Sequence, residues 1–178
     1  HGDYGLTEQC PIARAMRGYE GRGPATTLYD VLCRHYDLTD LLDLMDWIYD
    51  HRDIEASSLT PCVFLEALRG DAVAQGILTE VGKELAVSAN TALQKLFTSS
   101  DDPVVVAMGS VFQQAETPLM YDTFVHCLKT HWPRVDIRLL DCEPVLGAIY
   151  AAVGLAGAAP SALFREQLRA SFPGRPEI

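Results

Sequence analysis

The sequence contains no run of lysine and arginine, and its acidic residues outnumber its basic ones. With 24 Asp and Glu against 14 Lys and Arg, the formal net charge is -10 over 178 residues. A chain this acidic has no electrostatic means of binding nucleic acid or an anionic membrane without specificity. We therefore expect neither nucleic acid nor a membrane surface as a partner.

Membrane spans and paired cysteines are also missing. No apolar stretch approaches the roughly 20 residues that a membrane-spanning helix needs, and no signal peptide is visible. The five cysteines form no Cys-x-x-Cys pair, so their spacing indicates neither a zinc site nor a redox motif. We expect free thiols in a cytoplasmic protein. Because the chain opens with HGDYG rather than Met, we also expect sequence upstream of it.

Hydrophobic residues make up 48% of the sequence, enough for one domain with a sizeable core. In the first half, helical periodicity predicts helices over 11–21, from Pro24 to Tyr36, after Thr39, over 59–69 and over 71–97. We expect Gly76 and Gly82 in the last of these to admit another helix at close range.

An aspartate stripe, Asp40, Asp43 and Asp46, follows Thr39. Three carboxylates could be a metal site. Their three-residue spacing is also what an amphipathic helix requires of its solvated face, and this interpretation is favoured. We therefore predict no metal site.

The pattern changes after Pro103. Short apolar runs at 104–108 and 135–140 predict two strands, each followed by a helix, and a last helix covers 161–172. Such strand–helix units form parallel sheets that are normally buried on both faces. Two strands alone leave long unpaired edges. The sequence therefore predicts a partial sheet, which a missing segment or a partner chain completes.

Gly109 and Ser110 stand where the first predicted strand ends. Ligands of parallel sheets bind outside the carboxyl ends of the strands, and a glycine there allows a ligand to approach the backbone. A glycine at that corner can equally serve only to turn the chain. The small residues Gly147, Ala148, Ala151 and Ala152 after the second strand predict close packing of their helix on a neighbour.

A family resemblance joins these stretches. VVVAMGSVF at 104–112 and VDIRLLDCEPVLGAIYAAVG at 135–154 resemble the C-terminal part of the N-acetylglucosamine kinase family, in the BadF/BadG/BcrA/BcrD ATPase grouping. Upstream, ARAMRGYEGRGPATTLYDVLCRHYDL at 13–38 and the helix, Gly-Asp, helix stretch at 48–86 also resemble that family. The order and spacing of these motifs extend the resemblance from about residue 12 to about 155.

The resemblance implies an α/β fold: the helix-rich C-terminal lobe of an actin-like, ribonuclease H-like ATPase, with an incomplete sheet. Residues 1–158 would form this lobe, and 159–178 a final helix and tail. Gly109, Ser110 and Val111 would border the nucleotide. Asp3 would match the family's Gly-Asp-Glu-Gly-Ser turn, although Tyr4 and Leu6 here replace its Glu and Ser.

The family's phosphate loops, sugar-binding residues and catalytic aspartate have no counterpart in this sequence, so we predict no catalytic residue here. ATP and Mg²⁺ would act in the complete enzyme, which phosphorylates an amino sugar. The implied partners are an N-terminal lobe and a second copy in a homodimer. An alternative is a non-catalytic relic or dimerisation module of the same fold. A third possibility, a dehydratase activator with an iron–sulfur cluster, finds no support because Cys127 and Cys142 are isolated.

Overall fold

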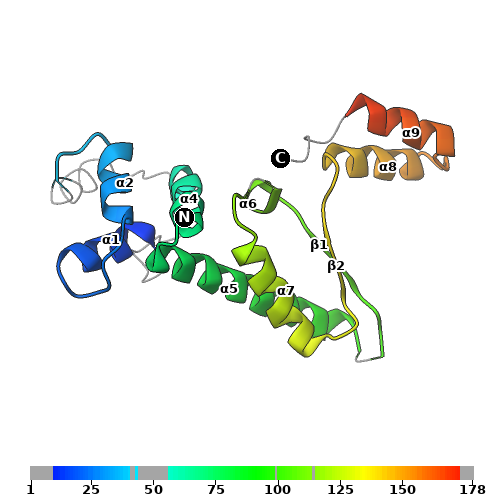
Figure 1. The fold of residues 1–178 in the computed structure, drawn as a ribbon. Coiled ribbons are helices and arrows are strands. Elements are labelled where there is room, and N and C mark those ends of the chain that lie inside the picture. The colour runs from blue at the N-terminus through cyan, green and yellow to red at the C-terminus, as the bar shows by residue number, and fades with distance from the viewer. Residues whose placement is uncertain (1–9, 41–42, 44–55, 99, 114, 173–178) are drawn as a thin grey trace.

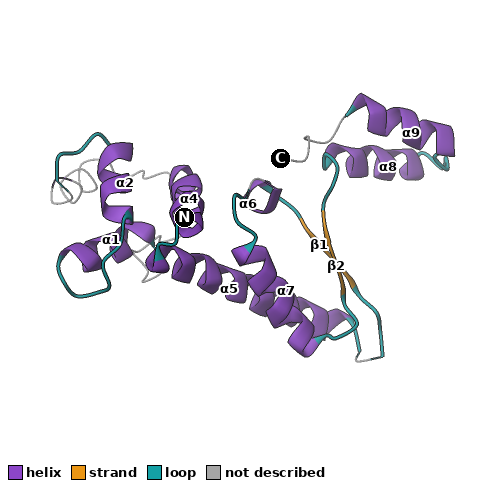
Figure 2. Cartoon of the chain, in the orientation of Figure 1, coloured by secondary structure: helices purple, strands orange, loops and turns teal. Residues whose placement is uncertain are grey.

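The computed structural model describes residues 10–40, 43, 56–98, 100–113 and 115–172. Within them, a helical body leads into two strands and two C-terminal helices (Figures 1 and 2). The elements are α1 (Pro11–Tyr19), α2 (Leu28–His35), the 3-10 helix η1 (Ala56–Leu59), α4 (Thr60–Leu68), α5 (Ala72–Leu96), β1 (Val104–Ala107), α6 (Ser110–Gln113), α7 (Leu119–His131), β2 (Asp136–Leu139), α8 (Val145–Leu155) and α9 (Ala162–Ser171).

Most predicted elements are present, with bounds that differ by a few residues. The predicted helix from Pro24 begins only at Leu28, because Thr26 and Thr27 are held by contacts described below. Nearly all of the helix predicted after Thr39, including Asp46, lies outside the described residues. In the part of the chain that the structure describes, no helix is long and apolar enough to cross a membrane.

The helical body is built around one hydrophobic cluster. α1, α2, α4 and the first half of α5 each turn an apolar face inward, because their apolar residues recur at helical spacing. The cluster includes Ile12, Met16, Leu28, Leu32, Phe64 and Ile77. A second, smaller cluster continues along α5 and α7 to the strands and includes Ala86, Leu93, Phe124, Leu128 and Val135.

A glycine allows α5 and α7 to pack closely. A Cβ atom built on Gly82 would lie 2.6 Å from the Met120 carbonyl oxygen and 3.0 Å from Cβ of Thr123. The predicted close approach of another helix is thus confirmed at Gly82. It is wrong at Gly76, where a Cβ would meet no atom within 4 Å.

The two strands form a parallel pair, as the sequence predicted. Val104 pairs with Asp136 and Ala107 with Leu139, and α7 makes the crossover between the strands. The chain is therefore a helix-rich α/β structure with a small parallel sheet.

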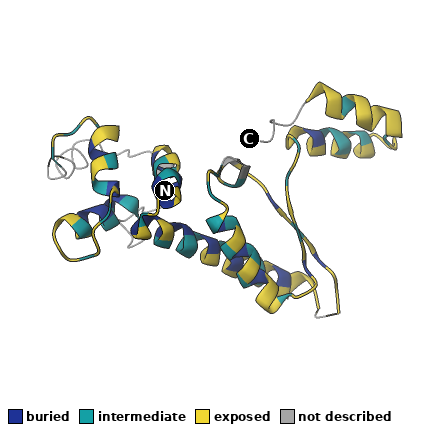
Figure 3. Ribbon diagram, in the orientation of Figure 1, coloured by how far each residue is buried: buried dark blue, intermediate teal, exposed yellow. Residues whose placement is uncertain are grey.

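Only one face of this sheet is covered. Val105 and Ile137 pack against the second cluster on α5 and α7. On the opposite face Val104, Val106 and Met108 are 52%, 47% and 54% exposed. No described element lies over this outer face (Figure 3), so the two strands form a partial sheet in the described chain.

α8 carries no charged side chain, yet most of it is exposed. Only Leu146 is buried, while Val145 and Leu155 are open to solvent. A Cβ built on Gly147 would meet no atom within 4 Å. The prediction that the small residues of this helix pack closely on a neighbour is therefore wrong for the described chain. A helix that is apolar all round is usually a buried one.

Candidate functional site

The carboxyl ends of β1 and β2 lie side by side. The Leu140 amide donates a hydrogen bond to the Ala107 carbonyl at 2.9 Å, so the pairing persists one residue beyond β2. From there β1 continues into Gly109 and α6, and β2 continues toward Asp141 and α8. This is the edge at which a parallel sheet binds its ligands.

Gly109 is required here by backbone conformation. Its φ of +108° lies in a region that side-chain-bearing residues rarely adopt. The Phe112 amide donates to the Gly109 carbonyl at 3.1 Å, which closes the turn into α6. A Cβ on Gly109 would meet no atom within 4 Å. The backbone at this turn is therefore open to a neighbouring molecule.

Two of the four residues predicted to border a nucleotide, Gly109 and Val111, can be placed in full. Gly109 and Val111 are exposed on either side of Ser110, whose side chain lies outside the described part of the structure, as does all of Asp3. The ring of Phe112 packs 6.2 Å from Tyr121 and 6.1 Å from Phe124, measured between ring centroids. Phe112 thus attaches the turn to α7, and Gly109 and Val111 remain at the surface.

The edge carries acidic rather than basic side chains. Asp141 and Glu143 are exposed beyond β2, and Asp141 forms a 3.7 Å ion pair with Arg169. Among the described residues, no group of three or more His, Cys, Asp and Glu side chains could hold a metal ion. The described residues at this edge thus offer an open backbone surface flanked by acidic side chains.

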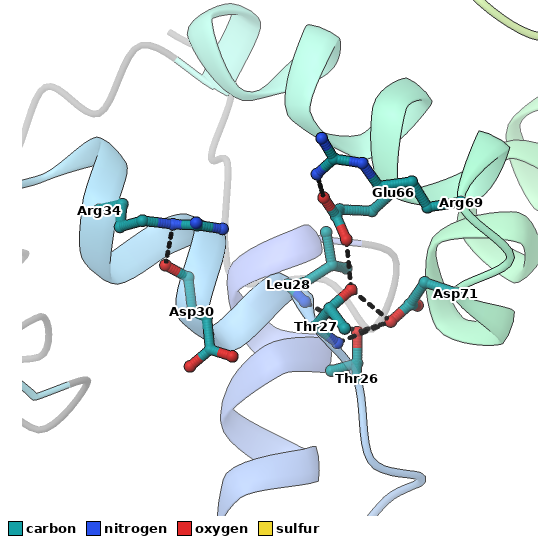
Figure 4. A network of polar contacts seen from close by, with 8 residues as sticks. All are labelled: Thr26, Thr27, Leu28, Asp30, Arg34, Glu66, Arg69 and Asp71. Carbon is teal, nitrogen blue, oxygen red and sulfur yellow. Dashed lines mark hydrogen bonds and ion pairs between the residues drawn. The ribbon is translucent and has the colours of Figure 1, made fainter.

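A polar network that the sequence did not predict connects α2, α4 and α5 (Figure 4). The Asp71 carboxylate accepts the Ala74 amide at 2.8 Å, which caps α5, and the Thr27 amide at 2.7 Å. The Thr26 hydroxyl also donates to Asp71 at 2.9 Å. The Thr27 hydroxyl lies between two carboxylates, 2.5 Å from Glu66 and 3.0 Å from Asp71.

Buried Glu66 completes this network through its ion pair with Arg69 at 2.7 Å. Burial acts to raise the pKa of Asp71, but the hydrogen bonds from Ala74, Thr27 and Thr26 outweigh it and lower that pKa. These groups bond one another and hold three helices together, so we interpret the network as structural. The Gly70-Asp71 pair predicted the α5 cap; no sequence signal predicted its distant threonine partners.

Two characterised proteins are similar to this chain in sequence. The chain is 26% identical over 160 residues to N-acetyl-D-glucosamine kinase of Dictyostelium discoideum, covering 85% of this chain and 49% of that protein. It is 27% identical over 143 residues to N-acetylmuramic acid/N-acetylglucosamine kinase of Clostridium acetobutylicum, covering 79% of this chain and 46% of that protein. No protein-family model and no solved structure matches the chain.

These similarities confirm the resemblance predicted from the motifs. The chain spans about half the length of the curated relatives it matches. They support a chain that resembles the C-terminal portion of the N-acetylglucosamine kinase family.

Proposed function

We propose that this chain is the C-terminal, nucleotide-side lobe of an ATP-dependent amino-sugar kinase with an actin-like fold. The observation that carries the proposal is the similarity to two N-acetylglucosamine kinases over about half their length. The complete enzyme would transfer the γ-phosphate of ATP, with Mg²⁺, to a hydroxyl of N-acetylglucosamine, glucosamine or a similar hexose. Residues 1–158 would form the lobe and 159–178 its terminal helix and tail.

In this proposal the turn at Gly109 is one wall of the adenosine pocket. The open backbone at Gly109 and the exposed side chain of Val111 support this placement. Ser110 lies between them, and Asp3 would join from the start of the chain. The phosphate-holding loops and the catalytic aspartate would come from the other half of the enzyme, since phosphoryl transfer depends on positioning the phosphates and Mg²⁺.

The exposed outer face of β1 supports a missing partner in the same way. Val104, Val106 and Met108 form an apolar strip that is exposed to solvent in the described chain. Further strands and helices of the complete enzyme would cover it, because parallel sheets are normally covered on both faces. A homodimer of complete chains is also part of the proposal.

Steady-state kinetics of the full-length protein test the proposal. We expect ATP-dependent phosphorylation within a panel of N-acetylglucosamine, glucosamine and N-acetylmuramic acid. The variant Gly109→Ala should raise the KM for ATP and leave the KM for the sugar unchanged. The control is Gly76→Ala, where a Cβ meets no atom within 4 Å. Full-length protein that phosphorylates none of these sugars would overturn the proposal.

A non-catalytic interaction module of the same fold is the second candidate. The apolar strip on β1 and the exposed apolar helix α8 favour it, because both are surfaces suited to another protein. Translating the gene upstream of His1 separates the two candidates. An in-frame Asp-Gly-Gly-Gly-Thr phosphate loop supports the kinase, whereas a start codon immediately before His1 supports the module.

A further inference from the structure

A hollow of about 550 Å³ lies at the end of the sheet opposite Gly109, where α5 and α7 end and the strands begin. Its lining includes Asn90 and Gln94 of α5, Phe97 just after α5, His131 at the end of α7, and Trp132 and Arg134 between α7 and β2. Asn90 and Gln94 are four residues apart and so lie on one face of α5. The volume falls within the roughly 300–1,000 Å³ of small-molecule sites. None of the residues proposed to border the nucleotide lines this hollow.

The aromatic wall of the hollow is held in place. The Trp132 indole donates its Nε1 hydrogen to the Asn90 side-chain oxygen at 2.9 Å, and the residue is half-buried. Phe97 contributes a second, exposed ring at the end of α5. An indole fixed in one orientation is a flat apolar surface, against which the C–H face of a ring-shaped ligand can lie at little entropic cost.

Polar groups beside this wall keep spare hydrogen-bonding capacity. His131 contacts the Cys127 carbonyl through Nδ1 at 3.2 Å, and its Nε2 has no partner among the described residues. The Gln94 amide likewise makes no hydrogen bond within the described part of the chain. An amide offers both donors and an acceptor, and an imidazole offers one or the other. Together they match a ligand that carries several hydroxyl groups.

The charges around the hollow are already compensated. Arg134 pairs with Asp102 at 3.0 Å and donates to the Ser100 carbonyl at 2.5 Å. The Asp101 carboxylate accepts the Thr98 amide at 2.7 Å. Asp101 and Arg134 line the hollow, and Asp102 pairs with Arg134. These three charges leave no excess positive charge to attract a phosphate.

We propose that this hollow binds a neutral sugar ring. The apolar face of the pyranose covers the Trp132 indole, and its hydroxyl groups bond Gln94 and His131. None of the residues proposed above to border the nucleotide lines this hollow, so the two proposed sites are separate on this chain. The inference does not depend on the proposed kinase activity.

The test follows the indole N–H signal of Trp132 by NMR in ¹⁵N-labelled full-length protein. The variant Trp132→Phe assigns the signal. Titration with methyl β-D-glucopyranoside should shift it saturably. Gln94→Ala should raise the dissociation constant about fivefold, which corresponds to one lost hydrogen bond. Phe97→Ala should raise it as well. Thr91→Ala, an exposed α5 position outside the hollow, should leave it unchanged.

A charged probe adds a second criterion. Glucose 6-phosphate should bind no more tightly than the neutral glucoside, because the hollow lacks excess positive charge. The proposal is overturned by an indole signal that does not move, by a Gln94→Ala affinity equal to that of the parent, or by tighter binding of the phosphorylated sugar.

Discussion

The carboxylate of Asp71 accepts a hydrogen bond from the backbone amide of Thr27 at 2.7 Å, across 44 residues of sequence. The same carboxylate caps α5 through the Ala74 amide. One side chain therefore begins α5 and fixes the segment that leads into α2. The two contacts join local helix formation to the packing of the body.

Replacing Asp71 with Ala should destabilise the protein by about 2 kcal/mol, the upper end for loss of an N-cap, because the distant Thr27 amide loses its acceptor as well. Asp101→Ala is the matched control. Asp101 also accepts a backbone amide, that of Thr98, but it is exposed and bonds only within its own loop. Urea unfolding measures both variants. Equal losses would show that the contact across 44 residues contributes nothing.

Asp71 should also give the protein an acid-sensitive component of stability. Its pKa is lowered in the folded state because its hydrogen bonds outweigh the effect of burial. The unfolded chain therefore binds this proton more readily. The stabilisation is present above the unfolded pKa of about 4 and is lost as pH falls through the lower folded pKa. Urea midpoints measured across this range should fall less steeply for Asp71→Asn than for the parent.

Gly82 and Gly76 provide a test of helix packing within α5. Gly82→Ala should cost about 1–3 kcal/mol, because its Cβ would lie 2.6 Å from the Met120 carbonyl oxygen and force α7 away. Gly76→Ala has open space around it and should stabilise the helix by up to about 1 kcal/mol. Thermal unfolding should therefore move in opposite directions. A shift of the same sign in both variants would contradict the α5–α7 contact.

If the outer face of β1 is covered in the full-length protein, Val106→Lys should destabilise that protein more than a lysine placed at an exposed position. In the full-length protein, a buried lysine should cost about 2 kcal/mol or more. Val87→Lys on α5 should cost less than about 0.5 kcal/mol, since Val87 is 57% exposed and belongs to no proposed interface. Urea denaturation of the two full-length variants measures their free energies of unfolding. If both are equally stable, the outer face stays open to water in the full-length protein, against the proposed covering.

The Cys33 thiol should resist alkylation. Burial raises its pKa, and the carboxylates of Asp30, Asp40 and Asp43 add to this effect, against a hydrogen bond from Tyr29. The reactive species is the thiolate, so both burial and a raised pKa slow the reaction. Mass spectrometry after mild iodoacetamide treatment at neutral pH should find Cys33 unmodified in the folded protein. Rapid labelling would place it at the surface.

Local signals in the sequence account for most of the elements. Gly70 and Asp71 marked the end of α4 and the start of α5, since a stop residue followed by a cap acts through adjacent backbone groups. The runs around Val105 and Ile137 indicated strands, and the intervening helix indicated that they are parallel. Gly109 marked the turn at the sheet edge, where its positive φ requires a glycine.

The failures concern what each element packs against. The hydrophobicity of Val104 and Val106 indicated a buried strand, but both are exposed in the described chain, where no element covers that face of the sheet. The small residues around Gly147 misled in the same way. The start of α2 was misplaced because Asp71, far along the chain, holds Thr27. Contacts across such distances leave no periodic trace in a single sequence.

The position of the helical body's core in the sequence also has a consequence for the order in which the parts of the chain fold during synthesis. Every buried member of its cluster except Met120 lies between residues 12 and 78. On a ribosome, these residues emerge before β1 and β2 exist. We expect the body to collapse while the strands are still being translated, since segments made first can fold first. α7 would then dock Met120 onto a surface that is already formed, and carry the strand pair into place behind it.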